Sequence, residues 1–511
     1  MRTFWRAVVI AVAATTLSAA GGTGSAVPVK PDDKTILHVL NRAGFGARPG
    51  DVERVRQIGL AAYIEQQLQP QRIPDAAIAA RLEPFATLTK SSRELAETYF
   101  APAQMAKQRA RREAAAGASM GDAPARTPEQ MQLMRAERAV LLDLSGQKIV
   151  RAIYSERQLQ EVMTDFWFNH FNVFANKGAT QQYLTEYERD TIRPHALGKF
   201  RDLLGATAKS PAMLFYLDNW QSADPDAAMP RRAALMQPER PRRGLNENYG
   251  RELMELHTLG VEGGYTQQDV VNVARAFTGW TIDQPRQGGS FRFEPRLHDR
   301  QEKHVLGHKI RAGGGQEDGE HVLDILARHP STARFIATKL ARRFVSDTPP
   351  ASLVDRAAAR FRDTDGDIRE VVRTILTSPE FFAPQAYRAK VKTPFEFVVS
   401  AIRASGSDVG ATDPLVQAVR TLGMPLYQCQ PPTGYPDRAE AWVNTGALIN
   451  RMNFALQLVG GRMRGVQWGG AAIAQTLGGE LSEATAATVA KATDPRQVAA
   501  LTLGSPEFQR R

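Results

Sequence analysis

Most of this chain of 511 residues carries apolar side chains at the three-to-four-residue spacing of an α-helix. Such spacing places them on one face of a helix, and that face must be buried against other elements. Alternating strand patterns are scarce, and only residues 290–294 and 303–307 show them, so we expect these two segments to pair as one hairpin. The sequence therefore predicts an all-α protein of many helices, with at most one small β-hairpin near residues 290–310. The helical segments are 150–169, 186–205, 246–260, 267–278, 319–329, 332–345, 353–361, 368–377, 395–405 and 445–458.

The composition supports a folded protein and excludes several kinds of site. Hydrophobic residues make up 43% of the chain and charged residues 23%, a balance that allows a large core. The single cysteine, Cys429, excludes intramolecular disulfides, cysteine zinc clusters and iron–sulfur centres. The net charge is +11, but no basic block is interleaved with aromatic residues, so nucleic acid is not expected as a partner.

The amino-terminal segment has the order of a secretory signal peptide. Arg2 and Arg6 precede an apolar run at 7–14, and small residues follow up to Ala26. We expect residues 1–26 to contain the signal peptide, with cleavage after Ala20 or Ala26, and the protein to be periplasmic or extracellular. No later run is long and apolar enough for a membrane helix, so no transmembrane anchor is expected after cleavage. We expect residues 27–460 to form one large helical domain with surface insertions near 100–130 and 222–243, and residues 461–511 to form a helical extension packed on it.

The first motif that carries chemistry lies in residues 161–172. At 100° per residue, Glu161, Asp165, Asn169 and Asn172 fall on one stripe, while aromatic residues occupy the rest of the helix. A helix that is aromatic nearly all round is buried, so its polar stripe must face partners, a cavity or water. His170 fits either a hydrogen-bonded core histidine or a ligand or proton-transfer group.

The second motif is residues 244–260, a predicted amphipathic helix that Asn246 caps and Gly260 ends. Two interpretations stay open. The charged face is solvated and joined by ion pairs from Arg251, or another helix covers it and it forms an acid–base or metal site. The His-Glu-x-x-His spacing of a metalloprotease is absent. The charged residues are Glu247, Arg251, Glu252, Glu255 and His257.

A third candidate is the pair His298–Asp299, in a loop, because an aspartate can orient an imidazole. We expect a polar centre where helix 161–170 meets segment 246–257, closed by this pair and Lys392. The cofactor stays open: the side chains of this centre can act as acid and base or can ligate one divalent metal, and haem bound through His170 is a weaker alternative. The candidate acid–base residues are Glu252, Glu255, His257, His298 and Asp299, and the candidate metal ligands are Asp165, His170 and Glu247.

Several motifs together resemble the bacterial family catalogued as domain of unknown function 1800, over about residues 34–460. The sequence departs from that pattern at Gly250, where a small helix former such as alanine is expected. The resemblance implies a mainly helical exported protein, often encoded beside a member of family 1501, and it supplies no activity or catalytic residue. The motifs are HVLNRAGFG at 38–46, WFNHF at 167–171, NENYGRELMELHTLG at 246–260, FTGW at 277–280, HD at 298–299, KTP at 392–394 and NRMNF at 450–454.

Two functions therefore stay open from the sequence. One is an exported enzyme of the cell envelope or medium with a carboxylate–histidine centre. The other is a non-catalytic envelope partner of the co-encoded family 1501 protein, in which the same motifs form a structural network. An open pocket lined by the motif residues favours the enzyme, and a sealed, fully paired network favours the partner.

Overall fold

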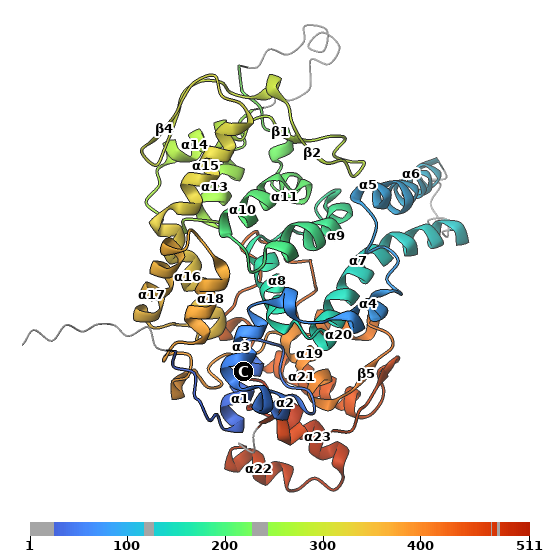
Figure 1. Ribbon diagram of the computed structural model, residues 1–511. Coiled ribbons are helices and arrows are strands. Elements are labelled where there is room, and N and C mark those ends of the chain that lie inside the picture. Colours follow the sequence, from blue (N-terminus) through green and yellow to red (C-terminus); the bar gives the residue numbers. More distant parts are fainter. Residues whose placement is uncertain (1–24, 117–126, 227–243, 472, 478–480) are drawn as a thin grey trace, which may run out of the picture.

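The structure is a computed structural model that describes residues 25–116, 127–226, 244–471, 473–477 and 481–511 (Figure 1). The expected signal peptide lies outside the described residues apart from its last two. Most of the expected insertion at 222–243 and the centre of the one near 100–130 also lie outside them. Among the described residues, no helix has both the length and the apolar character needed to cross a bilayer.

Helices form the body, as the spacing of apolar residues predicts. The long helix α7 packs against elements from both ends of the chain, namely α4, α19 and α20. Helix α6 runs beside the start of α7, where Lys107 pairs with Glu137 at 2.6 Å, and together they project from the body (Figure 1). The bounds in this half are α1 (Asp33–Arg42), α2 (Asp51–Ile58), α3 (Leu60–Gln67), α4 (Ala76–Leu82), α5 (Ser92–Leu95), α6 (Ala101–Ala116), α7 (Pro128–Tyr154) and α8 (Gln158–His170).

A second group of helices follows between residues 184 and 376. Helices α13 and α14 pack closely because Gly250 has no side chain. A Cβ at that position would lie 2.9 Å from the carbonyl oxygen of Val270 and 3.1 Å from the nitrogen of Ala274. The glycine that departs from the expected alanine is therefore required by this contact. The bounds are α9 (Leu184–Glu186), η4 (Tyr187–Ile192), α10 (Phe200–Lys209), α11 (Pro211–Tyr216), α13 (Glu247–Glu255), α14 (Gln267–Ala276), α15 (Gln316–Arg328), α16 (Pro330–Phe344), α17 (Ala351–Asp363) and α18 (Ile368–Leu376).

The expectation of at most one hairpin is wrong, because the described residues contain three two-stranded antiparallel sheets. The segments expected to pair with each other each have another partner. Phe291 pairs with Ile282, and His304 pairs with Lys309 across a tight turn in which Leu306 and Gly307 both have positive φ. The sheets are β1 (Trp280–Ile282) with β2 (Phe291–Phe293), β3 (Lys303–Val305) with β4 (His308–Ile310), and β5 (Asp408–Val409) with β6 (Val466–Gln467).

The two ends of the described chain meet in the lower part of Figure 1, where the first helices lie beside the last ones. His38 Nε2 donates to the carbonyl of Phe381 at 2.9 Å, and Arg403 pairs with Asp51 at 3.2 Å. Residues 461–511 pack on the body, since β6 pairs with β5 and α23 packs against α21. The bounds are α19 (Pro394–Ser405), α20 (Asp413–Thr421), α21 (Thr445–Val459), α22 (Glu483–Val489) and α23 (Pro495–Gly504).

Candidate functional site

Helix α8 runs through the core, and its polar stripe faces partners as expected. Arg193 donates to both carboxylate oxygens of Glu161, at 2.7 and 2.8 Å. Asp165 pairs with Lys148 at 2.7 Å. These two carboxylates are therefore neutralised inside the protein, which removes most of the cost of burying them.

The two amides of the stripe fix a neighbouring loop, residues 424–438, to the end of α8. The Asn169 side chain accepts from the nitrogen of Tyr435 at 2.7 Å and donates to its carbonyl at 2.8 Å. Asn172 donates to two carbonyls of segment 429–431, at 2.9 and 2.8 Å. Gly434 has a φ of +73°, and a Cβ there would lie 2.2 Å from the Asn169 carbonyl oxygen. These contacts hold residues 424–438 in place against the end of α8.

A cavity of about 220 Å³ lies between this loop, the end of α8 and helix α16. We call it the central pocket. Charged, polar and apolar side chains line it, and they come from four segments that are distant in sequence. The lining residues are Asp165, Phe166, Asn169, His170, Lys339, Arg342, Arg343, Thr393, Met424, Thr433, Tyr435, Pro436, Asp437 and Arg438.

His170 lies at the floor of the central pocket with both ring nitrogens engaged. Nε2 lies 3.1 Å from the carbonyl oxygen of His257, which can only accept, so Nε2 carries the proton. Burial, reinforced by the nearby charge of Lys339, holds the pKa of His170 well below its usual value. The ring is therefore neutral, and its Nδ1 accepts a hydrogen bond from Lys339 Nζ at 2.8 Å.

Lys339 has no acidic partner within ion-pair distance among the described residues. Burial lowers its pKa to about 8, and the charge of Arg342 acts in the same direction. Asp437 opposes this shift from a greater distance. Near neutral pH the amine is thus charged but close to losing its proton.

The central pocket has an excess of positive charge because its acids are already paired. Asp165 is neutralised by Lys148, and Asp437 pairs with Lys390 at 2.8 Å. Arg343, in turn, pairs with Glu396 at 2.5 Å. Of the remaining cations, Lys339 and Arg342 have no carboxylate within ion-pair distance among the described residues, and Arg438 has Glu440 at 3.9 Å. This charge pattern suits an anion.

Helix α13 begins at the predicted cap, where Asn246 accepts from the nitrogen of Tyr249 at 3.0 Å. It ends at Glu255 rather than continuing to Gly260, because the chain turns and the Thr258 hydroxyl donates to the Leu253 carbonyl. The early end frees His257 from the helix. Its buried ring lies 5.1 Å from the ring of Phe171, and burial lowers its pKa to about 3.

The carboxylates of α13 lie away from the central pocket lining. Glu247 is exposed and accepts from Gln267 at 2.8 Å, and Glu255 accepts from Tyr265 at 3.0 Å. Glu252 is half-buried, and burial together with the charge of Glu255 raises its pKa. Arg251 donates to Gln267. Among the described residues, Arg251 does not form the intrahelical ion pairs that the solvated-face interpretation expects.

His298 and Asp299 belong to a separate buried cluster, which we call the sealed network. Its members are Arg275, Thr278, His298, Asp299, Lys303 and Asp318. His298 Nδ1 donates to the Thr278 carbonyl at 2.8 Å, and its Nε2 lies 3.2 Å from Asp318. Arg275 pairs with Asp299 at 2.6 Å, and the fully buried Lys303 pairs with Asp318 at 2.8 Å. Each charged member thus has an opposite charge beside it.

The structure brings together only part of the predicted site. Asp165 and His170 line the central pocket, and the carbonyl of His257 contacts the His170 ring. The two motifs therefore meet at this pocket, as expected. Glu247, the third proposed metal ligand, is elsewhere on the surface. No group of three or more His, Cys, Asp or Glu side chains in the described part of the chain is placed to hold a metal ion. With both nitrogens engaged, His170 offers no open position to a metal or haem iron.

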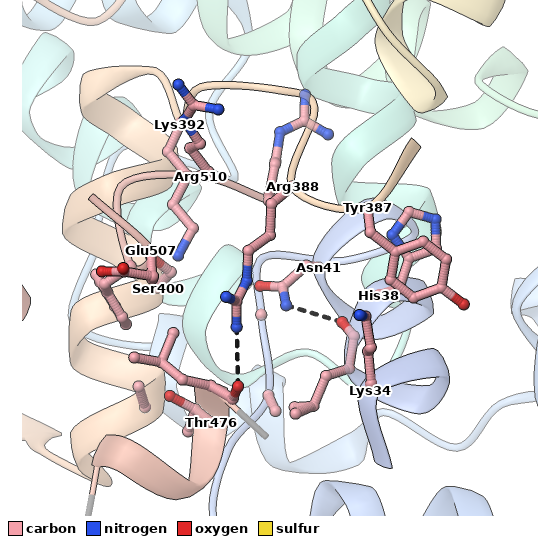
Figure 2. A pocket seen from close by; sticks show the side chains of 17 residues that line it. Lys34, His38, Asn41, Tyr387, Arg388, Lys392, Ser400, Thr476, Glu507 and Arg510 are labelled. Carbon is pink, nitrogen blue, oxygen red and sulfur yellow. Dashed lines mark hydrogen bonds between the residues drawn. The ribbon is translucent and has the colours of Figure 1, made fainter. Parts of the chain in front are cut away.

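Lys392 does not close this centre but lines a smaller cavity of about 40 Å³ between α1, α19 and the last residues (Figure 2). Its ammonium lies 3.8 Å from the centre of the Phe508 ring. Burial lowers the pKa of Lys392 to about 7, and Glu396 partly offsets that shift. Figure 2 shows Lys34, Arg388 and Arg510 around the same cavity.

Sequence reasoning missed Lys339, Arg342 and Arg438. One signal was present, since α16 contains lysine and arginine side chains but no aspartate or glutamate that could neutralise them within the helix. Such a helix needs anions from outside, either from another element or from a ligand.

The comparison with protein families gives one match, and it runs past the expected boundary at residue 460. No curated protein and no solved structure matches the chain. The matching family model covers residues 38–510 and is described as a protein of unknown function, DUF1800. The chain, whose helical body holds the central pocket, belongs to this family.

Proposed function

We propose that this protein is an exported enzyme that binds an anionic substrate in the central pocket and transfers a proton through Lys339. The observation that carries the proposal is the contact of Lys339 Nζ with His170 Nδ1 at 2.8 Å, in a pocket where no carboxylate pairs with the lysine. A lysine with a lowered pKa is suited to act as acid and base near neutral pH.

In this proposal the two side chains have different roles. The ammonium form of Lys339 attracts the substrate anion and donates a proton, and the neutral amine accepts one. His170 is a positioning residue. Its Nε2–H is fixed by the His257 carbonyl, so its Nδ1 lone pair always faces the lysine and directs Nζ without neutralising it.

The lining favours a substrate that carries a carboxylate, phosphate or sulfate group. Arg342 and Arg438 add guanidinium groups, which bind such oxyanions through paired N–H donors. A resident divalent cation fits this lining poorly, because the unpaired charges are positive and both acids are held by lysines. The expected signal peptide would place the reaction outside the cytoplasm.

The test is the binding of inorganic phosphate and sulfate, measured by calorimetry at pH 6.5 and 9.5, together with turnover of 4-nitrophenyl phosphate, sulfate and acetate. We expect binding to weaken as Lys339 loses its proton near pH 8. We expect Lys339→Met to abolish binding and to lower turnover by about 10²–10⁴-fold, the usual contribution of a proton-transfer group.

Lys309→Met is the matched control, because Lys309 is an exposed lysine paired with Glu302 outside the pocket. It should bind and react like the unaltered protein. Anion binding that persists in Lys339→Met, or that does not change between pH 6.5 and 9.5, would contradict the proposal.

One observation favours the alternative function, a non-catalytic partner of the co-encoded family 1501 protein. Four large apolar side chains on and next to α21 are exposed: Val443 at 47%, Leu448 at 44%, Ile449 at 55% and Leu456 at 53%. Apolar groups that gather on one helix face are typical of interaction sites. The test is co-sedimentation of the two purified proteins, which Ile449→Glu should abolish if this function is correct and Lys339→Met should leave intact.

A further inference from the structure

A cavity of about 380 Å³ lies apart from the central pocket, between helix α4, helix α7, the loop at 83–89 and residues 185–193. We call it the arginine cavity. Its volume is in the range of small-molecule sites. It shares no lining residue with the central pocket, so the proposed function does not use it.

One wall of the arginine cavity is apolar. Leu82, Phe85, Leu88 and Leu144 line it, and Leu144 belongs to the core. Phe85 approaches α7 closely because Gly146 has no side chain there, and a Cβ at Gly146 would lie 2.6 Å from the phenyl ring. This wall suits a hydrocarbon or aromatic body.

The loop that carries part of this wall is held at two points. Thr87 donates through its nitrogen and hydroxyl to Asp143 of α7, at 3.2 and 2.8 Å. On the other side, Arg189 donates to the carbonyls of Leu88 and Lys90, at 2.6 and 3.1 Å. The cavity is therefore formed before any ligand enters, which lowers the entropic cost of binding.

The lining also carries three arginines, and only one of them lacks an acidic partner among the described residues. Arg193 is held by Glu161, and Arg189 pairs with Asp190 at 2.6 Å. Arg151 donates through Nε to the Gln147 side chain at 2.9 Å, and no carboxylate of the described residues lies within ion-pair distance of it. Its guanidinium is therefore the one arginine charge of the lining without a carboxylate partner in the described part of the chain.

A second polar group of the lining is also unsatisfied. Thr185 is only 1% exposed, and its hydroxyl has no hydrogen-bond partner among the described residues. A buried hydroxyl without a partner is costly, and a ligand oxygen would remove that cost.

We propose that the arginine cavity is a binding site for an amphipathic organic acid, whose carboxylate pairs with Arg151 and whose apolar body lies against the leucine and phenylalanine wall. Arginine and a carboxylate form two parallel hydrogen bonds, so a carboxylate fits the open guanidinium. The apolar wall adds affinity that a short acid cannot use. Both ends of the ligand are thus required.

The experiment measures binding of octanoate to the whole protein by calorimetry, with 1-octanol and butyrate as probes that lack the charge and the apolar body. Octanoate should saturate one site and bind at least tenfold more tightly than either probe. Arg151→Gln should weaken octanoate binding about tenfold or more, and Ala79→Trp, which places a large ring in the cavity from an exposed position, should abolish it.

Matched controls separate binding from folding. Ala80→Trp adds the same ring at the next exposed position of α4, outside the lining, and Arg138→Gln removes an exposed arginine of α7. Both should bind octanoate like the unaltered protein. The proposal is overturned if octanoate shows no saturable binding, if 1-octanol binds as tightly, or if Arg151→Gln and Ala79→Trp bind as well as their controls.

Discussion

The central pocket and the sealed network contain the same kinds of side chain, but they differ in how the charges are paired. In the sealed network His298, Lys303 and Arg275 each lie beside a carboxylate, and the lysine is fully buried. In the central pocket, the hydrogen-bond partner of Lys339 is the neutral ring of His170, and no carboxylate of the described residues lies within ion-pair distance. The difference teaches that the number of titratable residues does not mark a site. What distinguishes the pocket is a charge left without a partner next to open volume.

Asp318→Asn in the sealed network should have the largest effect and tests the difference between paired and unpaired charges most directly. The change removes the negative charge at 2.8 Å from the buried Lys303, which keeps two backbone carbonyls and the more distant Asp299 carboxylate at 3.9 Å. Breaking a buried pair by removing one partner costs about 3–5 kcal/mol of unfolding free energy. Urea denaturation should show this loss, while anion binding in the central pocket is retained by the folded fraction.

The control for Asp318→Asn is Lys339→Met, which removes a charge that has no counter-ion and should not reduce the unfolding free energy. If Asp318→Asn and Lys339→Met had equal effects on stability, the distinction between a paired and an unpaired region would be wrong.

Gly250→Ala tests the helix that links the two regions. Helix α13 leads to His257 at the central pocket and packs on α14, which carries Arg275 of the sealed network. The added Cβ would meet backbone atoms of α14 at 2.9 and 3.1 Å, which cannot move as a side chain can. The gain of about 1 kcal/mol in helix propensity should therefore be exceeded by overpacking of about 1–3 kcal/mol.

The measurement for Gly250→Ala is the midpoint of thermal unfolding, with Gly244→Ala as the control because a Cβ there meets nothing within 4 Å. A Gly250→Ala variant more stable than the original protein would show that α13 and α14 can move apart without cost.

The pH dependence of stability should differ between the two regions. The pKa of Lys339 falls from 10.5 to about 8 on folding, so the unfolded chain binds more protons between these values and stability rises with pH across that window. Lys392, with a pKa of about 7, adds to the same rise. Asp318 has a lowered pKa, so its contribution is fully present above the unfolded value of 3.8 and is lost as pH falls from there through the lower folded pKa.

Lys339→Met should reduce the rise in unfolding free energy above pH 8 by on the order of 1–2 kcal/mol. This figure allows for the partial contact of the lysine with water. Urea denaturation at intervals from pH 7 to 10.5 measures it. If Lys339→Met left the pH profile of the unfolding free energy unchanged, the pKa of this lysine would not be lowered in the folded state.

The sequence predicted local features well and long-range pairing poorly, for a physical reason. The stripe of Glu161, Asp165, Asn169 and Asn172 follows from helical geometry alone, and each member has the partner that burial demands. Strand alternation marked Phe291 and His304 as strand residues, but alternation does not select a strand's partner. The expected hairpin was therefore wrong.

The candidate site shows the same limit. Its floor, His170, lies in a motif that the sequence singled out, and its charge comes from α16 and a loop more than 150 residues away. Charge density along the chain pointed to Glu247, Glu252 and Glu255 instead. Nothing local shows that Asp165 is neutralised by Lys148 while Lys339 is not, because pairing is decided by tertiary packing.

Glu247→Ala should have the smallest effect. It tests whether the acidic face of α13 contributes to the central pocket. Glu247 is exposed and accepts one hydrogen bond from the exposed Gln267, so its loss should change the unfolding free energy by less than about 0.5 kcal/mol. Phosphate binding in the central pocket should also be unchanged, because Glu247 does not line it. Calorimetry measures the binding. A large loss of anion binding would show that the acidic face of α13 acts on the pocket, and that the unpaired charge of Lys339 does not define the site by itself.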